Sequence, residues 1–337
     1  MSAETVVKPR AMRDALLSSL HRDMQADSDI FFVTADFGSP VLDAIRADRP
    51  DRFINVGIAE QNLINVSAGL ALEGFTVFAY AIAPFITMRC FEQIRVNLAL
   101  LSEVRKLNVN LIGVGAGYSY VVSGPTHQCY EDLTLMRALP NMQILSPSDH
   151  VAAAAMASRC RAQPGPKYVR LDAQVLPVLY DEDSFTLDDG FRVHVKGGPV
   201  CLVATGYMVH TTLKVAQRLA QAGIAVGVVD LFDITGFDAD KLAELLADYR
   251  GVVTLEEGFA GRGGLDAMMF DWVARRGLPL QVRNIGVSGG YRFELGNREQ
   301  LHEQVGIGLE AVYASVTEFV GSLQSRRSEA LIAGGER

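Results

Sequence analysis

Residues 52–62 read RFINVGIAEQN, which combines a short apolar strand, a glycine and the first turn of a helix. Apolar residues continue at helical spacing to Leu72, and Gly74 is a typical helix end. Glu60 therefore lies at a strand-to-helix junction, the edge at which α/β sheets bind ligands. An acid in a first helical turn also interacts favourably with the helix dipole, so Glu60 alone leaves a structural role open.

Strands and helices alternate on both sides of this junction. Apolar strands are predicted at residues 29–35, 75–82, 109–114, 142–145 and 167–171, in addition to the one that starts at Phe53. Helices are predicted at 13–24, 87–101, 126–139 and 150–161. This order is typical of an α/β protein with a largely parallel sheet covered by helices on both faces.

A second, smaller doubly wound unit follows an acidic, turn-rich segment at 181–190. Its strands are predicted at 200–204, 225–231, 251–255 and 281–285, with helices between them and a last helix from Glu310. We therefore predict a first domain at 1–175, a linker at 176–198, a second domain at 199–324 and a frayed polar tail at 325–337.

Composition narrows the class of protein. Of the 337 residues, 49% are hydrophobic and 21% charged, as in globular proteins with a large core, and a net charge of −8 argues against nucleic-acid binding. The four cysteines form no Cys-x-x-Cys pair, so we expect reduced thiols and a cytoplasmic protein. The N-terminus lacks the apolar core of a signal peptide, and Glu73 and Gly74 interrupt the apolar run 66–86, so no membrane segment is expected.

Four short motifs occur in a characteristic order: IAEQN at 58–62, PF at 84–85, GPTHQ at 124–128 and PNM at 140–142. This set resembles the pyrimidine-binding and C-terminal domains of the transketolase family, which includes 1-deoxyxylulose-5-phosphate synthase. The resemblance extends from about Met12 to about Val320. It implies that the first domain binds the pyrimidine ring of thiamine diphosphate.

The resemblance also implies roles at the cofactor. Glu60 matches the acid beside pyrimidine N1′, where a buried carboxyl shares a proton and shifts the ring to the imino form that deprotonates C2. Phe85 matches an aromatic residue that stacks on the pyrimidine ring, although core packing is an alternative. Ile58 and Phe91 are expected to line the same pocket, and for Phe91 core packing is the favoured alternative.

Substrate contacts are implied at the same edge. His127, within GPTHQ, would bind substrate hydroxyls and move protons near neutral pH. Arg13, Ser39 and Arg170 match positions that bind a substrate phosphate or distal hydroxyls, with a plain surface role as the alternative for each. Ser123 replaces an acid that transketolases usually carry, and the preceding loop lacks a histidine. We therefore expect a modified sugar rather than the ordinary pentose phosphates.

Half of the family's catalytic apparatus is missing from the sequence. No Gly-Asp-Gly motif occurs, although full-length members carry it in the domain that binds the diphosphate and Mg²⁺. We therefore expect the C-terminal subunit of a split transketolase. A separate N-terminal subunit would hold Mg²⁺ and share thiamine diphosphate, most simply in an α2β2 heterotetramer.

Three functions stay open at this point. The first is transfer of a two-carbon ketol unit from a ketose to an aldose. The second is a decarboxylating enzyme of the same fold, similar to deoxyxylulose-phosphate synthase or to the beta subunit of a 2-oxo-acid dehydrogenase. The third is a non-catalytic assembly or regulatory subunit. The match of IAEQ and GPTHQ to transketolases favours the first.

Overall fold

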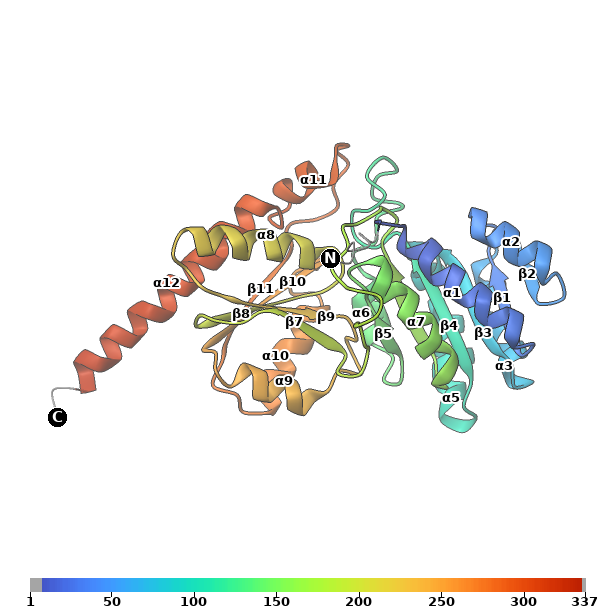
Figure 1. The fold of residues 1–337 in the computed structure, drawn as a ribbon, viewed down its shortest axis with the longest axis horizontal. Helices are drawn as coiled ribbons and strands as arrows, with labels where there is room; N and C mark the ends of the chain where they lie inside the picture. The colour runs from blue at the N-terminus through green and yellow to red at the C-terminus, as the bar shows by residue number, and fades with distance from the viewer. Residues whose placement is uncertain (1–7, 335–337) are drawn as a thin grey trace, which may run out of the picture.

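The computed structural model describes residues 8–334, with side chains to Leu323, and shows two α/β lobes side by side (Figure 1). The first lobe holds a six-stranded sheet of order β2-β1-β3-β4-β6-β5, in which every pair is parallel. The expected parallel sheet is thus confirmed. Its strands are β1 (Ile30–Thr34), β2 (Phe53–Asn55), β3 (Thr76–Ile82), β4 (Asn108–Val114), β5 (Gln143–Leu145) and β6 (Lys167–Leu171).

Helices cover both faces of this sheet because its side chains alternate between two cores. On β1, Phe32 faces one core and Val33 the other. One core contains residues of α1 (Met12–Ala26), α2 (Pro40–Asp48) and α7 (His150–Ala162), and the other contains residues of α3 (Glu60–Leu72). The carboxyl ends of the strands therefore share one edge, where Glu60 begins α3.

Two helical segments differ from the sequence prediction. The segment expected at 87–101 contains two π-helical stretches, η1 (Phe85–Arg89) and η2 (Ile94–Leu100), next to the short α4 (Phe91–Gln93) and α5 (Leu101–Val104). The helix expected at 126–139 is confined to α6 (Asp132–Arg137). The preceding residues form a loop instead, closed by two backbone hydrogen bonds between Gly117 and Cys129 at 2.9 and 3.0 Å.

The second lobe is a mixed five-stranded sheet of order β11-β10-β8-β9-β7. Its edge strand β7 (Phe191–Val195) runs antiparallel to β9 and lies within the range expected as linker. The domain boundaries at 175 and 199 stay predictions. The other elements are β8 (Val200–Ala204), α8 (Met208–Gln221), β9 (Gly227–Leu231), α9 (Ala239–Leu246), β10 (Gly251–Phe259), α10 (Leu265–Arg275), β11 (Gln281–Val287), α11 (Arg298–Gln304) and α12 (Leu309–Gly334).

The long helix α12 crosses the second sheet beside α8 and then projects away from the lobe (Figure 1). Residues 325–334, expected as part of a frayed tail, continue its helical backbone, and residues 335–337 lie outside the described part of the chain. Among the described residues, no helix is long and apolar enough to cross a membrane.

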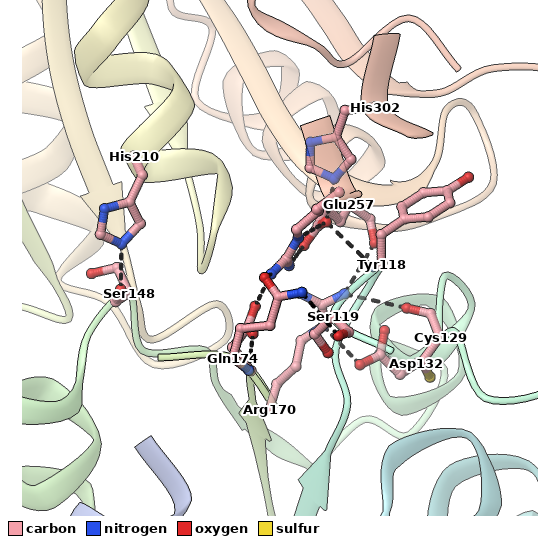
Figure 2. A network of polar contacts seen from close by, with 12 residues as sticks. Tyr118, Ser119, Cys129, Asp132, Ser148, Arg170, Gln174, His210, Glu257 and His302 are labelled. Carbon is pink, nitrogen blue, oxygen red and sulfur yellow. Dashed lines mark hydrogen bonds and ion pairs between the residues drawn. The ribbon is translucent and has the colours of Figure 1, made fainter. Parts of the chain in front are cut away.

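A buried group of charged side chains at the end of β10 joins the two lobes (Figure 2). Glu257 accepts a hydrogen bond from Arg298 Nε at 2.9 Å and contacts His302 Nε2 at 2.6 Å. Arg298 also pairs with Asp172, which follows β6, at 2.7 Å. Burial alone would raise the pKa of Glu257, but Arg298 and His302 lower it well below its usual range. Glu257 is therefore an ionised carboxylate at the joint.

Asp230, on β9, makes a second buried contact between the lobes. Its Oδ2 accepts hydrogen bonds from the hydroxyl of Tyr180, at 2.6 Å, and from that of Ser148. His210 Nε2 lies 2.7 Å from the carbonyl oxygen of Ser148 (Figure 2). Burial raises the pKa of Asp230 to about 7, although the two hydrogen bonds oppose that shift. The folded protein thus holds a proton on Asp230 that the unfolded chain releases at lower pH.

We expect Asp230→Asn to remove a pH dependence of stability. Because the folded pKa exceeds the ordinary value of 3.8, the carboxyl stabilises the fold least above pH 7. The wild type should lose about 2 to 3 kcal/mol of unfolding free energy relative to the variant between pH 5 and 8. Urea unfolding at four pH values measures this, with exposed Asp183→Asn as the control. Parallel curves for wild type and Asp230→Asn would contradict the assignment.

Candidate functional site

Glu60 is a buried acid at the carboxyl edge of the first sheet. It begins α3 after a turn in which Gly57 adopts a φ of +74°. Its side chain is 2% exposed, and its Oε2 lies 2.7 Å from Nη1 of Arg89, the last residue of η1. A first-turn acid that only complements the helix dipole would not need burial or a specific cation. The ion pair instead compensates a carboxylate that is removed from water.

Phe85 and His127 lie next to this pair. Phe85 begins η1, directly after β3, and the Arg89 guanidinium lies 4.8 Å from the centre of its ring. The edge of one ring faces the other between Phe85 and His127, with centroids 5.3 Å apart. His127 Nδ1 is 3.0 Å from the hydroxyl of Thr126. The structure thus joins Glu60 to Phe85 through Arg89, and His127 to this pair through the ring of Phe85.

Arg13 extends the group on the far side of His127. The ring of Tyr120 lies 6.3 Å from that of His127. Burial raises the pKa of Tyr120, and the positive charge of nearby Arg13 opposes the shift. Arg13 pairs with Asp14 at 2.8 Å and is only partly buried. Along the strand ends, the carboxylate of Glu60 is thus followed by aromatic rings, by His127 and by Arg13.

An open pocket of about 450 Å³ lies in front of Glu60. Its lining includes Ile58, which is 76% exposed, as well as Arg89 and polar residues of α3. A buried carboxyl beside an exposed aliphatic side chain and a nearby aromatic ring suits one end of a flat, nitrogen-containing ring. The donor set therefore fits the pyrimidine half of thiamine diphosphate, provided that Arg89 moves from the face of Phe85.

Three other predicted residues lie apart from this group. Ser39 caps α2, and its hydroxyl accepts a hydrogen bond from the backbone N–H of Leu42 at 3.3 Å. Ser123 is exposed in the loop after β4. Phe91 packs against the core that contains α3, as its favoured alternative role predicts. No hydrogen bond joins any of the three to Glu60, Phe85 or His127 within residues 8–334.

Arg170 differs from its expected position at the substrate. Its guanidinium is 1% exposed, pairs with Asp132 at 2.7 Å and donates to the carbonyl oxygen of Glu257 at 3.0 Å (Figure 2). Burial alone would lower its pKa, but Asp132 and Tyr168 raise it above the usual range. The second lobe covers this strand end, so Arg170 joins the lobes and is not open to substrate.

Sequence reasoning missed Arg89. It stands four residues after Phe85, a spacing that places two side chains on one helical face, so the signal was present. Its partner Glu60 is 29 residues away, however, and only the folded chain shows the ion pair. Among the described residues, no group of three or more His, Cys, Asp or Glu side chains could hold a metal ion.

Comparison with known families agrees with this architecture. Residues 8–178 match the family model of the transketolase pyrimidine-binding domain, and residues 190–312 match that of the transketolase C-terminal domain. The chain therefore belongs to the transketolase family, whose enzymes depend on thiamine diphosphate.

Some of the similar curated proteins are enzyme subunits of about the same length. One of them, a subunit of the apulose-4-phosphate transketolase of Actinobacillus succinogenes, is 32% identical over 78% of this chain and 83% of its own length. The 6-deoxy-6-sulfo-D-fructose transketolase subunit SqwH of a Clostridium species is 28% identical over 94% of this chain and 96% of its own. A solved structure described as a split gene transketolase, inactive beta4 tetramer, has a TM-score of 0.81 at 32% identity, covering 93% of this chain and 99% of that one.

Proposed function

We propose that this chain is the C-terminal subunit of a split transketolase that moves a two-carbon ketol unit from a ketose to an aldose. One observation carries the proposal. Glu60 is buried at the edge of the parallel sheet, paired with Arg89, and next to Phe85 and His127. The similarity to transketolase subunits of the same length supports the same function.

The residues of the site would divide the work as follows. Bound thiamine diphosphate supplies the carbon that attacks the ketose carbonyl. Glu60 would hold a proton at pyrimidine N1′, and Phe85 would stack against the ring once Arg89 leaves its face. His127 would donate hydrogen bonds to substrate hydroxyls and move a proton near the carbonyl oxygen. Arg13, at the far end, would bind the distal anionic group of the sugar.

The pocket needs a second chain to close it. Exposed apolar side chains occur beside Glu60, at Ile58, and along the segment from η1 to α5. They are Ile58, Met88, Val96, Leu100 and Val104, each between 39% and 87% exposed. A patch of this kind marks a protein interface. We assign it to an N-terminal subunit that holds the diphosphate and Mg²⁺, in an α2β2 heterotetramer. The description of the similar solved chain as an inactive beta4 tetramer supports the need for this partner.

We propose a modified ketose as the substrate. Ser123 stands, exposed, where transketolases usually carry an acid, so a sugar that reaches this loop would not meet that carboxylate. The similar subunits are named for apulose 4-phosphate and 6-deoxy-6-sulfo-D-fructose, and both are unusual ketoses with an anionic end. Arg13 is the residue of this chain that suits such an end.

A cytoplasmic location agrees with the state of the cysteines. All four are free and buried, and burial raises the thiol pKa of Cys90 and Cys160 to about 12. Protonated, buried thiols are inert and persist in a reducing compartment. We therefore propose that the assembled enzyme works in the cytoplasm.

Mixing experiments test the proposal. We expect ketol transfer from a modified ketose only when this chain, an N-terminal subunit, thiamine diphosphate and Mg²⁺ are combined, because neither chain alone encloses the cofactor. Product formation is followed by mass spectrometry, with each chain alone as a control. Full activity of this chain alone would contradict the split. Release of CO₂ from a 2-oxo acid, without ketol transfer, would favour the decarboxylating alternative.

A further inference from the structure

A second cavity lies between α1 and α7, on the face of the first sheet that α3 does not cover. Figure 1 shows the two helices side by side on that face. The cavity has a volume of about 350 Å³, enough for a small metabolite. It shares no residue with the Glu60 pocket or with the residues proposed to hold substrate. A ligand of this cavity would therefore bind apart from the proposed site of ketol transfer.

Small side chains open this cavity. Ala15 on α1 faces Ala154 and Ala155 on α7, and none of the three can fill the space between the helices. Val151 and Phe185 complete an apolar floor. The base of the cavity is thus apolar, and the polar groups come from the rest of its lining.

His150 supplies an unusual buried polar group. It is the first residue of α7, lines the cavity and is only 2% exposed. Neither of its ring nitrogens has a hydrogen-bond partner among the described residues. Buried side chains of this kind are almost always hydrogen-bonded, so the ring is poised to bind a group that enters the cavity.

The remaining lining favours an anion. Arg10 and Arg22 stand on the rim, and Arg10 Nη2 donates to the hydroxyl of Ser18 at 3.1 Å. The side chain of Arg22 is exposed and makes no ion pair or hydrogen bond within the described residues. The hydroxyl of Ser158 adds a further hydrogen-bond donor, whereas the N-terminal end of α7 is already capped by the Asp149 carboxylate. Glu182, exposed on the rim, and Asp149, which precedes His150, carry opposing charges.

From these contacts we propose that the cavity between α1 and α7 binds the phosphate group of a small metabolite. Two guanidinium groups, serine hydroxyls and an imidazole N–H match the charge and the several acceptor oxygens of a phosphate. The apolar floor would contact the carbon skeleton of a phosphomonoester.

Isothermal titration calorimetry of the full chain tests this proposal. The probes are inorganic phosphate and glycerol 3-phosphate, at ionic strength held constant with sodium chloride. We expect saturable binding of both, with glycerol 3-phosphate the tighter because it reaches the apolar floor. Arg22→Ala and His150→Ala should each weaken binding at least about tenfold. Glu182→Gln should tighten it, since it removes a negative charge from the rim.

Two controls separate this site from others. Arg46→Ala removes another exposed arginine, on α2, and should leave binding unchanged. Arg13→Ala removes the proposed substrate anion site, so the phosphate binding that remains in this variant should be that of the cavity between α1 and α7. Loss of phosphate binding in Arg13→Ala but not in Arg22→Ala would overturn the proposal. Unchanged binding in Arg22→Ala, whose exposed side chain is not needed for folding, would overturn it as well.

Discussion

Replacing Glu60 by glutamine is expected to lower ketol transfer by the assembled enzyme about a hundredfold to ten-thousandfold, the usual contribution of a positioned acid or base. Glutamine keeps the size of the side chain and can still contact the pyrimidine ring. It cannot exchange the proton that the proposed role requires. The same change removes the carboxylate that pairs with Arg89, so the affinity for thiamine diphosphate should also change.

The measurement is the steady-state rate of the mixed subunits at saturating thiamine diphosphate. Glu73→Gln is the matched control, because Glu73 ends the same helix and is exposed. Circular dichroism of Glu60→Gln should show an intact fold. A rate within about threefold of the wild type would remove Glu60 from the chemistry. It would then favour a non-catalytic role for this chain.

Local patterns in the sequence predict most of the helices and strands of the first lobe. The apolar run of β1 and the helical spacing after Glu60 depend on near neighbours, so the sequence is sufficient to find these elements. The antiparallel edge strand β7 was missed because its partner β9 lies more than 30 residues later. The π-helical turns of η1 and η2 depend on how this segment packs against α3, which periodicity does not show.

The candidate site, like the fold, could be predicted only in part from the sequence. Motif order predicted Glu60, Phe85 and His127, and the fold places Phe85 against His127 and joins Phe85 to Glu60 through Arg89. Arg170 was misplaced because a strand end was assumed to face a ligand, whereas here it faces the second lobe. A single sequence predicts which strand end carries an arginine, but it does not show what covers that end.

The second prediction with a large expected effect concerns the buried charged side chains between the lobes. Glu257→Gln is expected to cost about 3 to 5 kcal/mol of unfolding free energy, because it leaves the buried Arg298 without its paired charge. Arg298 is 2% exposed, and its guanidinium lies 3.6 Å from the ring centre of Tyr207, so it cannot turn to solvent. Asp172 would be its one remaining buried counter-charge among the described residues.

The neighbouring acid provides the control. Glu256 is as buried as Glu257, but burial raises its pKa to about 7, whereas the pKa of Glu257 is lowered. Glu256→Gln should therefore cost little at pH 7, since the amide resembles the protonated acid, while Glu257→Gln should be strongly destabilising. Because the folded pKa of Glu257 is depressed, the stability that it contributes is present at neutral pH and is lost as pH falls below about 4. Urea unfolding of both variants at pH 7 decides the matter: equal losses would mean that burial alone, and not the pairing with Arg298 and His302, determines the cost.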